Sequence, residues 1–411
     1  MSNKIIADVE KGMFLDETIN RYFLDRPLSD KEKSLIYQIT SGVIRWKGYL
    51  DWVLSLYATS KIRQDVRHLI WISLYQLAFM RKADFHVVNE TVEYAKSEVG
   101  RGQANFVNAV LRRFLREKSE STLSPEANAA RAFPHWLVNR WQKRFGETEL
   151  KKLLRSLNDI PKFGLRVNLS KISPSEAANR LTMEGIETSP GKLMDSSLTV
   201  DKLGPVLKSG MFLEGLIHVQ DEMSQLVGAA IGPQHAGTFI LDACAGLGTK
   251  TGQLMELCGN STIVCMDNEI RKLSSLANSH MRVAANAVSA PFRKDAFDVI
   301  LVDAPCSSLG ILRKHPEIKW RRRERDIHSF AAIQLELVDR LWDNLKRGGF
   351  MIYSVCSFEP EETVSVIEQF RKKRQFVLEN PLPFRFNREY FLSLPHETGA
   401  DGFFIAKMRK T

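Results

Sequence analysis

Long apolar stretches are missing from this 411-residue sequence. No run approaches the roughly 18 apolar residues that a membrane-spanning helix needs. The N-terminal segment also has Asp8 and Glu10 where the apolar core of a signal peptide would stand. We therefore expect a cytoplasmic protein that has no membrane partner.

Cysteine is scarce, with five residues in the chain, and no two of them have the C-x-x-C spacing of zinc frameworks and redox motifs. This excludes a zinc-ribbon or disulfide-scaffold protein, so we expect reduced thiols and no metal. All five cysteines lie in the C-terminal half, which indicates that this half carries the chemistry. They are Cys244, Cys258, Cys265, Cys306 and Cys356.

The composition, 44% hydrophobic and 26% charged, is typical of a globular protein. The length exceeds one ordinary core and predicts two or three domains. Lys and Arg number 58 against 48 Asp and Glu, which leaves a net charge of +10. Such an excess is typical of proteins that bind nucleic acid, but a basic surface that only aids solubility explains it equally well.

Hydrophobic periodicity divides the chain into three parts. Residues 1–125 carry apolar side chains at helical spacing and predict an all-helical domain. Residues 126–225 predict connecting helices and a small α/β domain. Residues 226–411 alternate apolar strands with helices, which predicts a doubly wound parallel sheet covered on both faces. Polar residues at the strand ends of such a sheet gather in one crevice, where ligands bind.

Local signals place several elements within these parts. Ser29 and Glu32 have the spacing of a capping box and predict the start of a helix. A further helix is expected over residues 174–183. The strands expected in the third part cover residues 239–242, 261–266, 297–302 and 349–353.

A glycine-rich turn follows the first of these strands. Gly246 and Gly248 let a ligand approach the backbone closely. The turn is not a P-loop, because Thr249 rather than glycine precedes Lys250. It is not a complete dinucleotide fingerprint either, because Gly252 comes one position late. By itself the turn indicates an adenosine-containing cofactor.

Asp267 follows the second expected strand. A carboxylate there can accept hydrogen bonds from both ribose hydroxyls of such a cofactor. An aspartate at this position can instead cap the following helix. The glycine-rich turn upstream favours the ribose role.

Two cysteines follow successive expected strands. Cys306 comes shortly after Asp303 in an Asp-Ala-Pro-Cys sequence, and Cys356 follows the strand at 349–353. The ends of neighbouring parallel strands can lie side by side, so two thiols and one carboxylate would surround one pocket. A free cysteine is more often a buried core residue, and either one alone would favour that interpretation. Two at successive strand ends, each followed by serine, favour a reactive site.

Two thiols, an acid and an adenosine cofactor fit methylation of cytosine at carbon 5. That carbon is a poor nucleophile until a thiolate adds to carbon 6 and makes an enamine, which can attack a sulfonium methyl group. A hydrogen bond at N3 assists the addition, and a base must later remove the carbon 5 proton so that the thiolate can leave. The target base must be unstacked to reach the thiol. Spacing alone does not settle which cysteine attacks.

At these residues the sequence resembles the RNA cytosine-5 methyltransferases, and within them the bacterial subgroup that acts on small-subunit ribosomal RNA. The resemblance covers nearly the whole chain, and the first 120 residues resemble the NusB-type helical RNA-binding domain fused in this subgroup. It implies that helical domain, a small RRM-like α/β connecting domain and a Rossmann-like S-adenosylmethionine-dependent methyltransferase domain. The most specific stretches are DAPCSSLGILRKHPEIKW (303–320), YSVCSFEPEE (353–362) and PHETGADGFFIAKMRK (395–410).

The resemblance also implies roles for single residues. Cys356 matches the family's nucleophile, and Cys306 matches the second cysteine, which helps to break the covalent adduct. Asp303 matches the residue that orients N3 of cytosine. The implied S-adenosylmethionine site consists of Cys244, Ala245, Gly246, Leu247, Gly248, Thr249, Lys250, Asp267, Asn286 and Asp303.

The chain departs from the family pattern at the cofactor site. Leu247, Gly248 and Thr249 replace the usual Pro-Gly-Gly, Gly246 replaces alanine, and Asn286 replaces aspartate. An asparagine can still accept a hydrogen bond from the adenine amino group, but it carries no charge. We expect these changes to alter cofactor affinity rather than the chemistry.

Two groups of basic residues are candidates for RNA contacts. The run at 313–325, which includes Lys319, follows the cysteine loop, and beside a base-binding pocket we expect phosphate contacts rather than a merely solvated face. Arg112, Arg113 and Arg116 lie on an amphipathic helix, where both interpretations are equally open.

We therefore expect a monomeric enzyme that makes 5-methylcytosine in small-subunit (16S) ribosomal RNA, with free or early-assembly RNA as its partner. One alternative is the same chemistry on transfer RNA or large-subunit ribosomal RNA. Another is a non-catalytic ribosome-assembly factor that has a weakened cofactor site. Asp303, Cys306 and Cys356 together argue against this last alternative.

We predict that residues 1–118 supply RNA affinity and not catalysis, because this all-helical segment has arginines and no cysteine. An enzyme lacking them should still bind cofactor but need more RNA to reach the same rate, above all at high salt, where the remaining phosphate contacts are weakest. Calorimetry with the cofactor and RNA titrations of the methylation rate measure the two effects. Loss of cofactor binding in the truncated enzyme would mean that the segment is structural instead.

Overall fold

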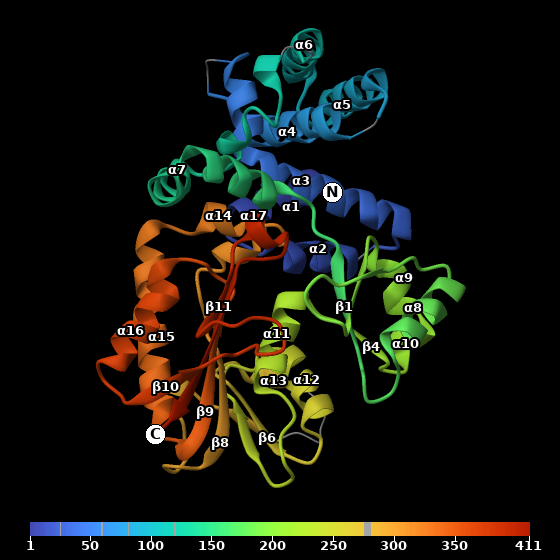
Figure 1. The fold of residues 1–411 in the computed structure, drawn as a ribbon. Coiled ribbons are helices and arrows are strands. Elements are labelled where there is room, and N and C mark those ends of the chain that lie inside the picture. The colour runs from blue at the N-terminus through green and yellow to red at the C-terminus, as the bar shows by residue number, and fades with distance from the viewer. Residues whose placement is uncertain (25, 59–60, 81, 119–120, 275–280) are drawn as a thin grey trace. The chain divides into compact units, whose positions relative to one another are not determined.

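The computed structural model describes residues 1–24, 26–58, 61–80, 82–118, 121–274 and 281–411 (Figure 1). The chain forms two compact units. The helical unit consists of Met1–Asp159 and Leu312–Arg323, and the α/β unit consists of Ile160–Ile311 and Glu324–Thr411. A short segment of the C-terminal half is therefore part of the helical unit. The domain boundaries expected near residues 125 and 225 stay predictions.

The helical unit follows the predicted periodicity. Ser29 caps α3 with the predicted capping box: its hydroxyl accepts the Glu32 N–H, and the Glu32 carboxylate accepts the Ser29 N–H. The apolar face of α6 is buried, and Arg112 and Arg116 on its other sides are exposed. The elements are α1 (Ser2–Glu10), α2 (Leu15–Leu24), α3 (Asp30–Ser55), α4 (Gln64–Phe79), α5 (Asp84–Glu98), α6 (Arg101–Glu117), η1 (Ser121–Leu123), η2 (Ala129–Ala132), α7 (His135–Asn158) and α14 (Ile318–Arg321).

The α/β unit begins with a small antiparallel sheet of order β2-β3-β1-β4. The predicted helix over residues 174–183 has those bounds in the structure, because Ser173 caps it and Pro174 fits its first turn. A separate apolar core lies between this sheet and its helices. The elements are β1 (Phe163–Val167), α8 (Pro174–Met183), β2 (Ser189–Pro190), β3 (Ser197–Val200), α9 (Leu203–Lys208), α10 (Gly210–Leu213) and β4 (Ile217–Val219).

A larger sheet of order β10-β12-β9-β8-β5-β6-β7 follows, and β11 pairs with β12. Its helices and strands are α11 (Glu222–Ile231), β5 (Phe239–Asp242), α12 (Thr249–Leu257), β6 (Thr262–Asp267), α13 (Ile270–Leu273), β7 (Met281–Ala284), β8 (Phe297–Asp303), α15 (Glu324–Trp342), β9 (Leu345–Val355), α16 (Val364–Arg371), β10 (Phe376–Glu379), β11 (Tyr390–Ser393), α17 (Pro395–Thr398) and β12 (Phe403–Lys410). Short 3-10 helices lie in its loops: η3 (Ala287–Ser289), η4 (Leu309–Ile311) and η5 (Pro360–Glu362).

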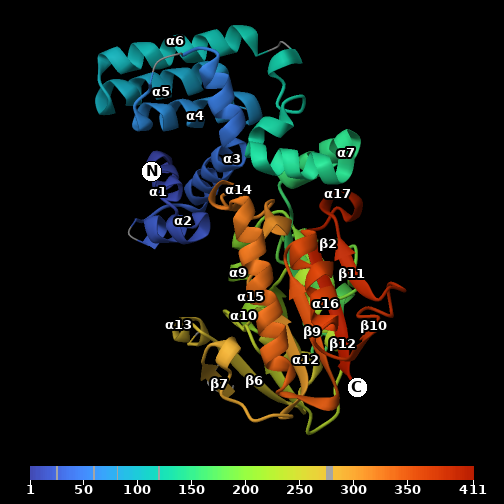
Figure 2. The same ribbon diagram turned by 90° about the vertical axis from the view of Figure 1, so that its left-hand side faces the viewer.

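Helices cover both faces of the larger sheet, as predicted. Alternate residues of β8 enter two different cores: Ile300 and Val302 pack with α15 and α16, whereas Val299 and Leu301 pack with α11 and α12. Figure 1 shows these helix pairs on opposite sides of the strands, and Figure 2 shows α15 and α16 side by side. The near-continuous apolar strands of the sequence follow from this burial on both faces.

The strand order reverses between β5 and β8. The chain runs from β5 outward to β6 and β7, and then returns to the other side of β5 for β8 and β9, all in parallel. Such a reversal opens a crevice at the carboxyl ends of the two central strands. Asp242 and Asp303 end these strands, and Ser354 of β9 lies beside Asp303.

The far edge of the larger sheet differs from the prediction of a parallel sheet. β12 runs antiparallel to β9, and β10 and β11 both pair antiparallel with β12. The sequence signal was missed because antiparallel neighbours need no covering helix between them, so no strand-helix alternation marks them.

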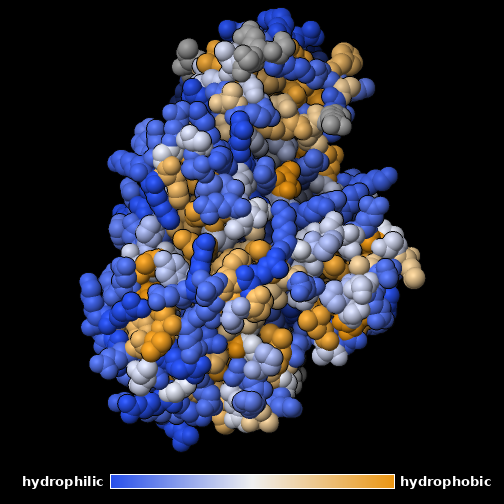
Figure 3. All heavy atoms as spheres, viewed as in Figure 1, coloured by the Kyte–Doolittle hydropathy of each residue, from blue (hydrophilic) through white to orange (hydrophobic). Residues whose placement is uncertain are grey.

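In the part of the chain that the structure describes, no helix has the length and apolarity to cross a membrane. Figure 3 shows hydrophilic side chains over most of the face in view, with apolar side chains in scattered patches.

Candidate active site

The turn after β5 has a backbone shape that favours glycine at two positions. Gly246 and Gly248 have φ angles of 55° and 82°, in the left-handed region that other side chains disfavour. A Cβ atom on Gly246 would meet no atom within 4 Å, so open space lies over the turn. The turn therefore leaves its backbone accessible directly before α12 begins at Thr249.

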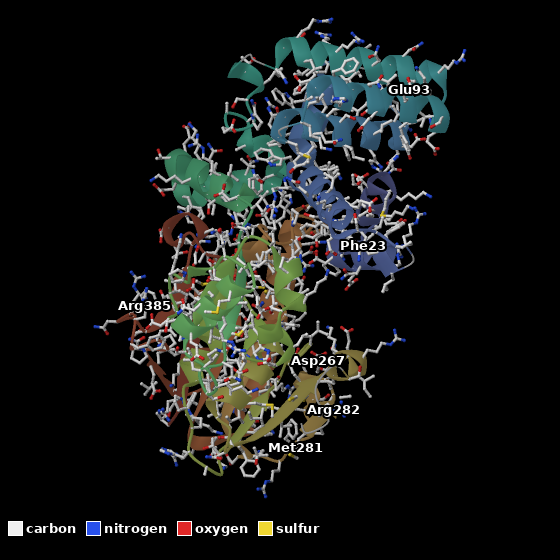
Figure 4. All side chains as sticks on the ribbon, turned by 90° about the vertical axis from the view of Figure 1, so that its right-hand side faces the viewer. Phe23, Glu93, Asp267, Met281, Arg282 and Arg385 are labelled. Atoms are coloured by element: carbon white, nitrogen blue, oxygen red, sulfur yellow. The ribbon has the colours of Figure 1, made fainter. Side chains whose placement is uncertain are left out.

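Asp267, at the end of β6, ties this turn to the neighbouring strand. Its Oδ2 accepts the Gly246 N–H at 3.0 Å, and its Oδ1 accepts the Glu269 N–H at 2.9 Å. The second bond is a local turn contact and not the helix cap that the sequence left open, because α13 begins after Glu269 and has no side-chain cap. Each carboxylate oxygen can accept a further hydrogen bond, so these contacts are compatible with the expected ribose role. Figure 4 shows Asp267 near Met281 and Arg282 of the adjacent β7.

Asn286 lies two residues beyond the end of β7. Because Ala284 of β7 lies opposite Asp267 of β6, the structure places Asn286 at the same sheet edge as Asp267. Asn286 is exposed, and its Oδ1 accepts the Val288 N–H at 3.0 Å and caps η3. A structural role therefore accounts for this residue as well as the expected cofactor contact does.

The structure brings the two loop cysteines together. The Sγ atoms of Cys306 and Cys356 lie 3.3 Å apart, and the Ser308 hydroxyl lies 3.5 Å from the Cys356 sulfur. Cys306 is buried, whereas Cys356 is partly exposed. Of the two thiols, Cys356 is the more exposed.

The contact between the two thiols shifts their pKa values in opposite directions. The hydrogen bond from the Cys306 thiol lowers the pKa of Cys356 against the effect of burial, and Ser308 and Lys250 contribute in the same direction. The same hydrogen bond, together with burial, raises the pKa of Cys306 well above its usual range. Cys356 is therefore the thiol that ionises more readily, with Cys306 as its hydrogen-bond donor, and a thiolate is the nucleophilic form.

The remaining cysteines have no such activation. Burial raises the pKa of Cys244, of Cys258 and of Cys265, the last to about 11. Cys258 and Cys265 belong to the apolar core between the sheet and α11 and α12. They are small core residues, the ordinary fate of a free cysteine.

Lys250 joins the glycine-rich turn to the cysteine loop. Its Nζ donates to Oδ2 of Asp303 at 2.5 Å, and the Ser354 hydroxyl donates to Oδ1 at 2.7 Å. Burial lowers the pKa of Lys250, but the Asp303 carboxylate outweighs it and the net pKa is raised. Lys250 is therefore a cation at neutral pH. The sequence placed it among cofactor residues and gave no sign of this ion pair.

Asp242 adds a second carboxyl group to the crevice. It is buried at the end of β5, and the Thr251 hydroxyl donates to its Oδ2 at 2.7 Å. Burial raises the pKa of Asp242 to about 6, against the Thr251 hydrogen bond, and the charge of Asp303 acts in the same direction as burial. This carboxyl group can hold or release a proton near neutral pH.

Glu362 connects the two cysteine loops, and the sequence interpretation missed it. Its Oε1 accepts the Ser307 N–H at 2.7 Å, and its Oε2 accepts the hydroxyls of Ser307 at 2.5 Å and Ser357 at 2.6 Å. Gln334 of α15 also donates to Oε1, at 3.2 Å. The available signal was the serine that follows each cysteine, because these serines are the donors that reach the shared carboxylate.

Backbone bonds close the cysteine loop behind the thiols. The Gly310 N–H donates to the Cys356 carbonyl at 3.1 Å, and the Gly310 carbonyl accepts the Gly402 N–H at 2.9 Å. A Cβ atom on Gly310 would stand 1.9 Å from the Gly402 carbonyl oxygen, so only glycine fits. The loop after Cys306 is thus fixed to β9 and to the segment that leads into β12.

The expected phosphate contacts are wrong for two residues of the basic run at 313–325. Arg313 and Lys319 are buried within the helical unit, at 8% and 1% exposure. Burial and the nearby Arg45 guanidinium lower the pKa of Lys319 well below its usual range. The run alternates basic with apolar residues, so α14 packs by its apolar residues and takes Lys319 inside with them. Arg323 and Arg325 remain exposed.

Among the described residues, no group of three or more His, Cys, Asp and Glu side chains could hold a metal ion.

Three segments of the chain match known families. Residues 229–409 match the family described as 16S rRNA methyltransferase RsmB/F, residues 1–116 match the NusB family, and residues 133–207 match the ferredoxin-like domain of RsmF/B-like methyltransferases. The chain is 33% identical over 417 residues to the ribosomal RNA small subunit methyltransferase B of Escherichia fergusonii, which covers 98% of this chain and 96% of that protein. The protein of the same name from Escherichia coli O6:K15:H31 is 32% identical, with the same coverage.

Solved structures share the fold. The protein PH0851 superposes with a TM-score of 0.79 at 22% identity, over 100% of this chain and 98% of that one. NSun6 from Pyrococcus horikoshii, solved with SFG, has a TM-score of 0.59 at 19% identity, over 68% of this chain and 98% of that one. The family matches confirm the predicted fold class: helical, small α/β and Rossmann-like methyltransferase parts.

We predict that iodoacetamide modifies Cys356 first, because the thiolate is the reactive form. The hydrogen bond from Cys306 lowers the pKa of Cys356, so its modification rate should reach half its maximum below the pH of roughly 8.5 that a free thiol requires. Cys306→Ala removes the donor and should move this midpoint upward, whereas Cys306→Ser keeps a hydroxyl donor as a matched control. Peptide mass spectrometry over a pH series measures both. Faster labelling of Cys306 than of Cys356 would contradict the assignment.

Proposed function

Because the chain belongs to the 16S rRNA methyltransferase family RsmB/F, we propose that it methylates carbon 5 of a cytosine in 16S ribosomal RNA through a covalent bond between Cys356 and carbon 6. The observation that carries this proposal is the thiol pair, 3.3 Å apart at the ends of two neighbouring parallel strands. Core cysteines would not need a contact between two thiols, a serine hydroxyl beside one of them and an ion pair nearby.

The order of events follows from the acidities of the two thiols. The Cys356 thiolate adds to carbon 6, and carbon 5 then takes the methyl group. Once Cys356 is bonded to carbon 6, the Cys306 thiol beside the new bond no longer donates to a thiolate. It releases its own proton to solvent, and its thiolate then takes the carbon 5 proton. The electron pair left by that proton expels the Cys356 thiolate, which regains its hydrogen bond from Cys306.

Asp303 and Lys250 would hold the cytosine ring at N3. Ser354 and Lys250 fix both carboxylate oxygens of Asp303, so its position is set before a base enters. Lys250 is the cationic donor at this carboxylate and can supply the hydrogen bond that assists addition at carbon 6. An ion pair already formed in the protein needs little rearrangement when charge develops on the ring.

The methyl donor would be S-adenosylmethionine, whose sulfonium group makes the methyl carbon electrophilic. The turn at Gly246 and Gly248 fits such a group, because its backbone is accessible and open space lies over Gly246. Asp267 and Asn286 would contact the ribose and the adenine from the ends of β6 and β7. Leu247, 68% exposed in place of the family's proline, offers the cofactor an apolar side chain instead of a rigid ring.

The RNA substrate would meet the exposed arginines of α6, Arg112 and Arg116, in a helical domain expected to span residues 1–125. The net charge of +10 favours a polyanionic partner. We propose a cytoplasmic monomer that acts on free or early-assembly 16S ribosomal RNA.

Bisulfite sequencing tests the substrate directly. Ribosomal RNA from a strain that lacks the gene should lose one 5-methylcytosine in 16S RNA, and the wild-type gene should restore it. The gene with Cys356→Ala should not, because the nucleophile is missing. A deletion strain with unchanged 16S RNA and a lost methyl group in another RNA would move the proposal to that RNA.

We predict opposite behaviour for the two cysteine variants. Cys356→Ala should be inactive and form no covalent complex. Cys306→Ala should add to the base and transfer methyl, and then stall, because breakdown of the adduct is impaired. Denaturing electrophoresis with substrate RNA and S-adenosylmethionine should show a retarded protein–RNA band for Cys306→Ala alone. A stable band from Cys356→Ala, with none from Cys306→Ala, would reverse the two roles.

A further inference from the structure

We propose that the helical unit positions the cysteine loop for methyl transfer, through the segment Leu312–Arg323, and that Lys319 and Trp320 are positioning residues. We call this segment the anchor segment. The proposal rests on the proposed function, because it concerns the rate of that reaction. It gives the helical unit a role beyond RNA affinity.

The chain path links the anchor segment to the thiols over a very short distance in sequence. Ser308, whose hydroxyl contacts the Cys356 sulfur, is followed by η4 (Leu309–Ile311), and the next residue, Leu312, already belongs to the helical unit. The chain rejoins the α/β unit at Glu324, where α15 begins. The cysteine loop therefore leads directly into the anchor segment at one end, and α15 follows it directly at the other.

Lys319 is the buried centre of the anchor segment. Its Nζ donates to the Arg45 carbonyl at 2.8 Å and to Oδ1 of Asn158 at 3.4 Å. The same nitrogen lies 3.9 Å from the centre of the Phe133 ring. These partners come from α3, from α7 and from the loop between η2 and α7, so one side chain gathers three parts of the helical unit.

Trp320 and Arg45 complete a reciprocal set of contacts with α3. The Trp320 indole N–H donates to the Ile44 carbonyl at 2.8 Å, and the Arg45 guanidinium donates to the Arg313 carbonyl at 2.7 Å. A Cβ atom on Gly48, one turn further along α3, would stand 2.2 Å from the Arg131 carbonyl oxygen and 2.8 Å from the Trp320 ring, so glycine is needed for both approaches. The anchor segment thus both receives hydrogen bonds from α3 and donates hydrogen bonds to it.

Lys319 and Trp320 each donate to a backbone carbonyl of α3, and such acceptors suit them to fix the position of the anchor segment. Ile44 and Arg45 lie in the middle of α3, where the helix itself already uses the backbone carbonyls. A side chain that bonds such a carbonyl gains directional contact with a rigid element, and directional hydrogen bonds specify one arrangement where apolar packing would tolerate several. Sequence alone suggested phosphate contacts for Lys319, and burial excludes them.

This proposal changes the expectation for the enzyme that lacks residues 1–118. Such a truncation removes α3, so the Trp320 indole loses its acceptor and the Lys319 ammonium keeps only Asn158. The turnover number should then fall together with RNA affinity.

Single substitutions in the full-length enzyme separate positioning from RNA binding. Trp320→Phe removes one hydrogen-bond donor and keeps a ring. Lys319→Met removes the buried donor at similar length, and Lys319→Gln restores a neutral donor. We expect kcat on 16S RNA to fall roughly tenfold in Trp320→Phe and Lys319→Met, because a misplacement of reacting groups by about 1 Å has effects of this size or larger. Lys319→Gln should recover part of the loss. The KM for RNA and the Kd for S-adenosylmethionine should stay within roughly twofold of wild type.

Trp71→Phe is the matched control for stability. Trp71 is buried in α4 of the same unit, and its indole nitrogen has no hydrogen-bond partner among the described residues. The variant should lower the melting temperature of the helical unit and leave kcat unchanged. An equal fall of kcat in Trp71→Phe would show that Trp320 and Lys319 act only through stability, and would overturn the proposal.

Two further outcomes decide the matter. A raised KM for RNA with unchanged kcat in Trp320→Phe and Lys319→Met would make the anchor segment an RNA contact instead of a positioning element. Unchanged values of both constants would also overturn the proposal. Wild-type enzyme is assayed in parallel, and inactivity of the wild type on 16S RNA would count against the proposed function rather than against this inference.

Discussion

The buried carboxylate of Glu362 brings the thiols of Cys306 and Cys356 into contact. Glu362 accepts hydrogen bonds from the serine after Cys306 and from the serine after Cys356, so both loops are fixed to the same point. Burial raises the pKa of Glu362, and the hydrogen bonds oppose that shift. A buried carboxylate is costly without such donors. The Glu362 carboxylate needs the hydrogen bonds from both serines, so Ser307 and Ser357 are held next to each other. The preceding residues, Cys306 and Cys356, are thereby brought into contact through their sulfur atoms.

Beside the two thiols, charged side chains lie at the carboxyl ends of β5 and β8, where the strand order reverses. Asp242 and Asp303 end the two central strands, Lys250 reaches from the glycine-rich turn to Asp303, and the thiols lie beyond them. One cation among several acidic groups keeps Asp303 paired and favours the thiolate form of Cys356. The cofactor turn and the reactive thiols are thereby parts of one electrostatic unit.

The sequence predicted the features that depend on local pattern. The capping box at Ser29, the helix Pro174–Met183 and the four central strands follow from spacing within a few residues. These elements appear near the expected positions, although β9 (Leu345–Val355) is longer at both ends than the expected 349–353. The ion pair of Lys250, the donors of Glu362 and the burial of Lys319 join residues that lie far apart in the chain. No local rule marks such partners, and a lysine in a basic run is usually solvated. The roles of single site residues stay predictions from the sequence resemblance.

The membership of Leu312–Arg323 in the helical unit also has a consequence for synthesis of the protein. The first 159 residues leave the ribosome early, but Lys319 and Trp320 fill places beside α3 that stay vacant until more than three quarters of the chain has been made. Contacts of such long sequence separation form late, since a large loop must close first. The N-terminal helices must therefore wait in an incomplete state during translation, and their missing contacts become available shortly before Cys356 is made. A chain that stops short of this point has neither a finished helical unit nor a thiol pair.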